Sequence, residues 1–128
     1  MTQLIEPVLL GEFAQDVWEE GVTGADLIAH QFEEKEEHIR SLQILLASYD
    51  VDGYDGEAFV LFLEDGKMYE VHGSHCSCYG LEDQWKPEEV TIEELDFRLN
   101  NGGGSNAWRI ELILLLERLK EIEAEAIN

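Results

Sequence analysis

Basic residues are scarce in this chain. Its 128 residues contain only 8 Lys and Arg against 29 Asp and Glu, which gives a formal net charge of −21. The acids are spread along the whole sequence, so the charge is not confined to a tail. A field of this sign repels nucleic acid and anionic lipid and attracts basic surfaces. The composition therefore predicts no direct nucleic-acid binding, no membrane binding, and a basic protein surface as partner, for example that of a nucleic-acid-binding protein.

Cysteines and long apolar segments are also few. The two cysteines, Cys76 and Cys78, are separated by one residue, which is too close for a relaxed disulfide and unlike the framework of a secreted mini-protein. The longest apolar run, residues 112–116, is far shorter than the roughly 18 residues that cross a bilayer. The first residues also lack the basic start of a signal peptide. We expect a reduced, cytoplasmic protein.

Apolar residues are plentiful enough for a core. Hydrophobic residues make up 45% of the chain and aromatic residues 9%, unlike the apolar-poor composition that keeps highly charged chains disordered. A length of 128 residues fits one domain, so we expect residues 1–128 to fold as a single unit.

Three β-prone segments occupy the middle of the chain, at about 42–49, 57–64 and 67–73. Asp65-Gly66 between the last two predicts a tight hairpin, and the Asp- and Gly-rich residues 50–56 predict a turn between the first two. The segment 42–49 is also compatible with a continued helix. The strand interpretation gives an α+β fold built on a three-stranded antiparallel meander.

Helices are predicted on both sides of these strands, at about 12–20, 24–39 and 91–100, followed by a long C-terminal helix that ends near residue 125. Thr91-Ile92-Glu93-Glu94 has the form of a capping box, in which Thr91 accepts from the backbone and Glu94 reaches back. We expect the apolar band of the last helix to cover one face of the sheet and the shorter helices to cover an end or edge.

Histidine and cysteine cluster directly after the third strand, in residues 72–80. Thiolate and imidazole are ligands that zinc prefers. On an extended chain His72, Cys76 and Cys78 face the same way and His75 the opposite way, so a zinc site would use the first three and a fourth ligand from elsewhere. The alternative is structural, with both cysteines acting as small buried apolar groups. We expect no cofactor, with zinc as the alternative.

Residues 73–85, Gly-Ser-His-Cys-Ser-Cys-Tyr-Gly-Leu-Glu-Asp-Gln-Trp, resemble the signature of an uncharacterised family of small phage and prophage proteins. The resemblance extends from about Leu45 to Leu95 and implies a phage or mobile-element setting, with the host cytoplasm as the location. It implies no mechanism.

These observations favour a small, acidic, non-enzymatic protein that binds a basic host protein surface, as an inhibitor of host defence or a nucleic-acid mimic. Two alternatives stay open: a metal-binding or thiol-dependent protein that uses the His72–Cys78 cluster, and a phage structural or assembly component. The candidate interaction residues form two acidic groups. They are Glu33, Glu34, Glu36 and Glu37, and Glu82, Asp83, Glu88, Glu89, Glu93 and Glu94.

Overall fold

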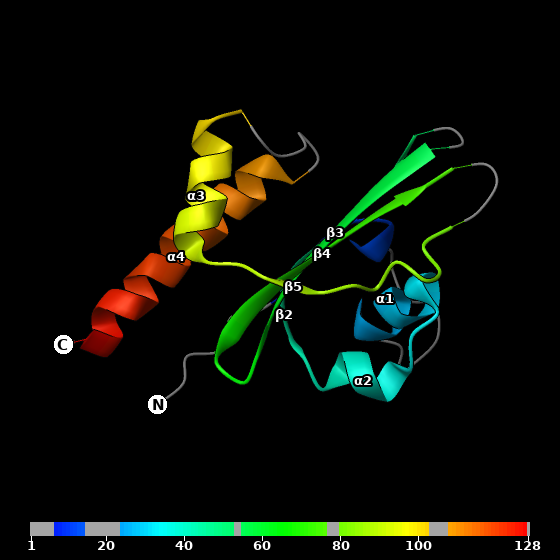
Figure 1. Ribbon diagram of the computed structural model, residues 1–128, viewed down its shortest axis with the longest axis horizontal. Coiled ribbons are helices and arrows are strands. Elements are labelled where there is room, and N and C mark those ends of the chain that lie inside the picture. Colours follow the sequence, from blue (N-terminus) through cyan, green and yellow to red (C-terminus); the bar gives the residue numbers. More distant parts are fainter. Residues whose placement is uncertain (1–6, 15–23, 53–54, 77–79, 103–107, 128) are drawn as a thin grey trace.

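A mixed five-stranded sheet forms the centre of the computed structural model, which describes residues 7–14, 24–52, 55–76, 80–102 and 108–127 (Figure 1). The strand order is β1-β2-β3-β4-β5. Strands β2 (Gln43–Asp52), β3 (Asp55–Glu64) and β4 (Lys67–His75) are antiparallel neighbours. Strand β1 (Val8–Gly11) runs parallel to β2, and β5 (Glu88–Glu89) pairs antiparallel with β4.

The α+β class is confirmed, but the three-stranded meander is wrong as a description of the whole sheet. Its three strands are the central ones, and each extends beyond the predicted bounds. The two added edge strands are short, four and two residues, and depend on pairing with β2 and β4. Strands this short carry too few residues to show a periodic pattern in the sequence.

The predicted hairpin at Asp65-Gly66 is confirmed. Glu64 pairs with Lys67, and both turn residues have positive φ, 53° at Asp65 and 79° at Gly66. This is the conformation that a two-residue turn needs to match the twist of its strands. The corresponding turn between β2 and β3, at residues 53–54, lies outside the described residues.

Both faces of the sheet are covered, which makes three layers (Figure 1). Helices α3 (Ile92–Asn100) and α4 (Arg109–Ile127) pack on one face, where Leu61 and Leu112 belong to one buried cluster. The helices α1 (Gly24–Phe32) and α2 (Glu36–Arg40) and the 3-10 turn η1 (Glu12–Ala14) pack on the other face. The expectation that the shorter helices cover an end or edge is therefore wrong, because the strands are apolar on both faces.

Strand β2 contributes residues to both clusters and contains a bulge. The pairing register with β3 shifts between Ile44 and Leu46. As a result Leu45 and Leu46, though adjacent in sequence, both pack in the cluster under α3 and α4, while Ala47 packs in the opposite one. A bulge places two residues opposite one and so breaks strict alternation. This explains why the sequence of this strand was also compatible with a helix.

The predicted helix 24–39 is two helices. Glu33 has a left-handed φ of 56°, and the N–H of Glu34 donates to the carbonyl of Ala29 at 2.9 Å. These features are typical of a Schellman helix end, which usually has glycine at the left-handed position. With glutamate there, the sequence carries no sign of the break.

The remaining helix predictions fare unevenly. Helix α3 confirms the prediction for 91–100, and α4 confirms the long final helix within a few residues at its end. Only η1 represents the helix predicted at 12–20, because residues 15–20 lie outside the described part of the chain. No helix in the described residues combines the length and apolar character needed to cross a membrane.

Candidate interaction surface

The few cationic side chains are mostly engaged within the molecule. Five of the eight Lys and Arg side chains form an ion pair or hydrogen bond with another residue of the chain. These five are Arg40, Arg98, Arg109, Arg118 and Lys120. The 29 acids far outnumber the 8 cations, so most surface carboxylates have no cation to neutralise them and the outward field is strongly negative.

Two of those cations, Arg40 and Arg98, pair with buried carboxylates. Among the described residues Asp26 and Glu70 are the buried acids, 7% and 4% exposed. Arg40 Nε donates to Asp26 Oδ1 at 2.8 Å, which ties α2 to α1. A buried carboxylate requires a paired charge and hydrogen bonds, since its desolvation is otherwise costly.

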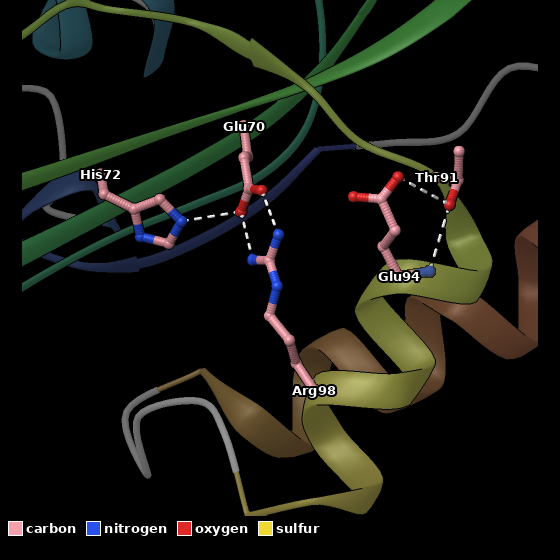
Figure 2. Close-up of polar contacts among 5 residues, drawn as sticks. All are labelled: Glu70, His72, Thr91, Glu94 and Arg98. Atoms are coloured by element: carbon pink, nitrogen blue, oxygen red, sulfur yellow. Dashed lines mark hydrogen bonds and ion pairs between the residues drawn. The ribbon is translucent and has the colours of Figure 1, made fainter.

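Glu70 is the centre of a three-residue cluster that links β4 to α3 (Figure 2). Arg98 Nη1 donates to Glu70 Oε1 at 2.7 Å, and Arg98 Nη2 donates to Glu70 Oε2. On the same side of β4, His72 Nε2 lies 2.7 Å from Glu70 Oε1. Because both carboxylate oxygens of Glu70 are occupied, the cluster positions α3 against the sheet.

The surroundings of Glu70 favour its ionised form. Burial alone would raise its pKa, but the hydrogen bonds from Arg98 and His72 and their positive charge outweigh burial and lower the pKa from 4.5 to about 2. The pKa of Arg98 is raised, first by its hydrogen bond to Glu70 and further by the charges of Glu94 and Glu88. Glu88 and Glu94 thus lie close enough to act on this cluster.

Six predicted interaction residues follow the edge of the sheet from the end of β4 to the first turn of α3. We call them the edge patch: Glu82, Asp83, Glu88, Glu89, Glu93 and Glu94. All except the half-buried Glu82 are exposed. Two sit on β5 and two begin α3, where Thr91 Oγ1 accepts from the N–H of Glu94 at 3.1 Å (Figure 2). The Glu94 carboxylate reaches back to the Thr91 hydroxyl, at 3.3 Å.

The other four predicted residues lie at the junction of α1 and α2, and we call them the corner patch: Glu33, Glu34, Glu36 and Glu37. Glu34 is half-buried and the other three are exposed. Glu36 approaches Arg40 at 3.7 Å, a long contact between exposed groups. The loop part of the edge patch packs beside α1, since Trp85 meets Phe32 edge-on at 5.1 Å, whereas Glu93 and Glu94 lie on α3 over the other face of the sheet.

Two hollows lie beside the edge patch. One, of about 290 Å³, is lined by Glu70, His72, Asp83, Gln84, Lys86 and Glu88. The second, also about 290 Å³, shares His72 and Gln84 with it and continues to Glu57 and Trp108. Two carboxylates of the edge patch, Asp83 and Glu88, therefore border concave surface.

Hydrogen bonds of Gln84 join the segment after β4 back to that strand. Gln84 belongs to residues 73–85, which we call the signature segment. Its amide oxygen accepts from the N–H of Ser74 at 2.8 Å, and its amide nitrogen donates to the carbonyls of Ser74 and Gly80 at 2.7 and 2.8 Å. The amide thus bonds Ser74 as a neighbouring strand would, beyond the point where β5 stops pairing.

Apolar packing fixes the same segment. Leu81 is fully buried, and a Cβ on Gly73 would lie 3.0 Å from Leu81 Cδ2 and 3.2 Å from Phe32 Cε1. Trp85 stacks on Phe62 at 5.7 Å between ring centroids and meets Phe32 edge-on at 5.1 Å. Trp85 is thus a packing residue, and Gly73, Leu81 and Trp85 have a structural role.

The zinc ligands predicted at His72, Cys76 and Cys78 are only partly described. The Nε2 atom of His72 is engaged with Glu70. Cys76 lies four residues further along, about 13 Å at the rise of an extended chain. Cys78 lies outside the described residues, and within them no three His, Cys, Asp or Glu side chains are grouped to hold a metal. The zinc site stays a prediction.

Sequence reasoning missed the cluster of Glu70, His72 and Arg98. The one indication of this cluster in the sequence was Glu70, an acid on β4 that faces the same side of the strand as the buried Met68. An acid at a core-facing position of a strand indicates a buried charge that needs a cation. Arg98 is the partner, but only folding brings a residue 28 positions away to this strand.

Comparison with protein-family models, with curated proteins and with solved structures gives no match. The resemblance of residues 73–85 to a phage and prophage family therefore stays a prediction.

Proposed function

We propose that the protein is a non-enzymatic acidic interaction protein that binds a basic protein surface through the edge patch, in the manner of an inhibitor that mimics nucleic acid. One observation carries the proposal: five of the eight cationic side chains are engaged within the molecule, while five of the six edge-patch acids are exposed. Unneutralised carboxylates attract and orient a basic partner.

The edge patch is a better candidate than the corner patch for two reasons. Its acids extend over the loop, β5 and the start of α3, and they border concave surface at Asp83 and Glu88. The ion pair between Glu70 and Arg98 fixes the position of α3, which carries Glu93 and Glu94 in its first turn. Preorganised charges bind with a smaller entropic cost than mobile ones.

The test is capture by the immobilised protein from a bacterial lysate at low salt, followed by elution with increasing salt and by competition with duplex DNA. We expect basic nucleic-acid-binding proteins to be retained, to elute at moderate salt, and to be released by DNA, because all three depend on the same charges. Retention of neutral or acidic proteins that resist salt would contradict the proposal.

A further inference from the structure

Three large apolar side chains stand out in solvent on α3 and α4. Phe97 is 68% exposed, Ile110 66% and Leu114 61%. Single exposed apolar residues are ordinary. These three, however, make up all but one of the exposed large apolar side chains of the described residues, the fourth being Val51 on β2, which is only 38% exposed.

The three side chains point away from the sheet for a geometric reason. Phe97 is two residues from the buried Leu95, and Ile110 and Leu114 are each two residues from the buried Leu112. Two residues are about 200° around an α-helix, so these positions oppose the core. The chain thus places bulky apolar groups where packing does not require them. We call Phe97, Ile110 and Leu114 the outer face.

Polar and apolar contacts join the two helices. The Lys120 ammonium pairs with the Asp96 carboxylate, and Arg109 Nη2 donates to the carbonyl of Leu99. Leu99 and Leu112 share one buried cluster. The outer face is therefore carried by two helices that contact each other as well as the sheet.

Carboxylates lie beside two of the three apolar groups, Phe97 and Leu114. Glu93 and Glu94 are four and three residues before Phe97, and Glu117 is three residues after Leu114, all exposed. Residues at these spacings are neighbours on a helix surface. Glu93 and Glu94 also belong to the edge patch, so the outer face begins where that patch ends.

We infer that the outer face is the apolar centre of the binding surface, and that its occupant is a basic protein surface with an apolar pocket for Phe97. The inference rests on the proposed function and adds the partner's chemistry to it. Charge complementarity selects this occupant, since Lys and Arg around an apolar pocket would meet Glu93, Glu94 and Glu117. A second copy would bring the same acids against one another, which is unfavourable.

The test compares two cationic probes of equal lysine content, poly-L-lysine and an amphipathic helical peptide of lysine and leucine. We expect the lysine–leucine peptide to bind at least about tenfold more tightly, because only it can bury the outer face. Amide chemical-shift changes on its titration should concentrate on residues 93–98 and 110–118.

The decisive variant is the triple replacement Phe97→Ala, Ile110→Ala and Leu114→Ala. Alanine preserves helix formation, so circular dichroism should be unchanged. The preference for the lysine–leucine peptide should fall to within about twofold, since the variant keeps every charge but loses the apolar area. The control Val51→Ala, at an exposed apolar position on β2, should keep the full preference.

Three results would overturn the inference. Equal binding of both probes by the wild type, unaffected by the triple variant, would leave the proposed function standing without an apolar centre. Binding of neither probe would remove the proposed function as well. Concentration-dependent dimerisation in sedimentation equilibrium, abolished by the triple variant, would make a second copy the occupant.

Discussion

The buried carboxylate of Glu70 on β4 accepts hydrogen bonds from both terminal nitrogens of Arg98 on α3, so this ion pair joins the sheet to the helix that carries Glu93 and Glu94 in its first turn. Arg98 is 42% exposed and Glu70 only 4%. The Arg98 side chain is thus partly exposed to solvent, whereas the Glu70 carboxylate that it contacts is buried.

Removing the cation should be costly. In Arg98→Met the Glu70 carboxylate stays buried with only His72 as partner, and we expect a loss of about 2–3 kcal/mol in the free energy of unfolding, measured with urea. The control Arg118→Met breaks an exposed pair with Glu121 and should cost under about 1 kcal/mol. The double replacement Glu70→Met with Arg98→Met should regain much of the loss, because no charge is then left buried. Equal losses in the single variant and its control would contradict this account of the pair.

The same carboxylate should make stability depend on pH. The pKa of Glu70 is lowered to about 2 in the folded protein, so its contribution is present above its unfolded pKa of about 4.5 and is lost as pH falls from there toward 2. A shift of this size corresponds to about 3 kcal/mol. Urea unfolding of the wild type and Glu70→Gln between neutral pH and pH 2 measures it. The difference between them should shrink as pH falls; a constant difference would contradict the lowered pKa.

Gly73 should not accept a side chain. A Cβ there would meet Leu81 and Phe32, so we expect Gly73→Ala to cost about 1–3 kcal/mol in urea unfolding. Gly80→Ala in the same segment is the matched control, because its Cβ would meet only the end of the Glu82 side chain, at 3.0 Å. Its expected cost is under about 0.5 kcal/mol. If both variants cost the same, close packing beneath the signature segment is not the reason for Gly73.

Gln84 should protect the backbone of Ser74. In Gln84→Glu the carboxylate can still accept from the Ser74 N–H, but it cannot donate to the carbonyls of Ser74 and Gly80. Amide hydrogen exchange at Ser74 and its neighbours should therefore accelerate. Amides of the β2–β3 ladder serve as the internal reference and should keep their rates. Unchanged exchange at Ser74 would show that the amide is not what holds this edge.

Local sequence signals predicted local structure. The Asp65-Gly66 turn and the Thr91 cap depend on residues within a few positions, so the hairpin and the start of α3 were found. Strands β1 and β5 exist only because β2 and β4 lie beside them, and no pattern of their own marks them. The break at Glu33 was missed because a glutamate stands where glycine usually marks a helix end.

The candidate site was predictable to a similar extent. Composition alone identified the acids, and the structure adds that the edge patch borders concave surface and that Arg98 beside it is paired with the buried Glu70. The ion pair of Glu70 with Arg98 was beyond sequence reasoning, since it depends on a contact between distant segments. For the cysteines and histidines of residues 72–78, a structural role was the main expectation and metal or thiol chemistry the alternative; nearby, Gly73, Gln84 and Trp85 have structural roles.

The central claim is that the position of the acids, and not the net charge alone, makes the binding surface. The most direct measurement is the dissociation constant for a captured basic protein, at low and at moderate salt, for two variants of equal charge change. One variant neutralises Asp83, Glu88 and Glu89 of the edge patch, and the other neutralises Glu33, Glu36 and Glu37 of the corner patch. We expect the edge variant to weaken binding about tenfold or more and to flatten its salt dependence, and the corner variant to stay within about threefold of the wild type. Equal weakening by the two variants, or none by either, would contradict the claim.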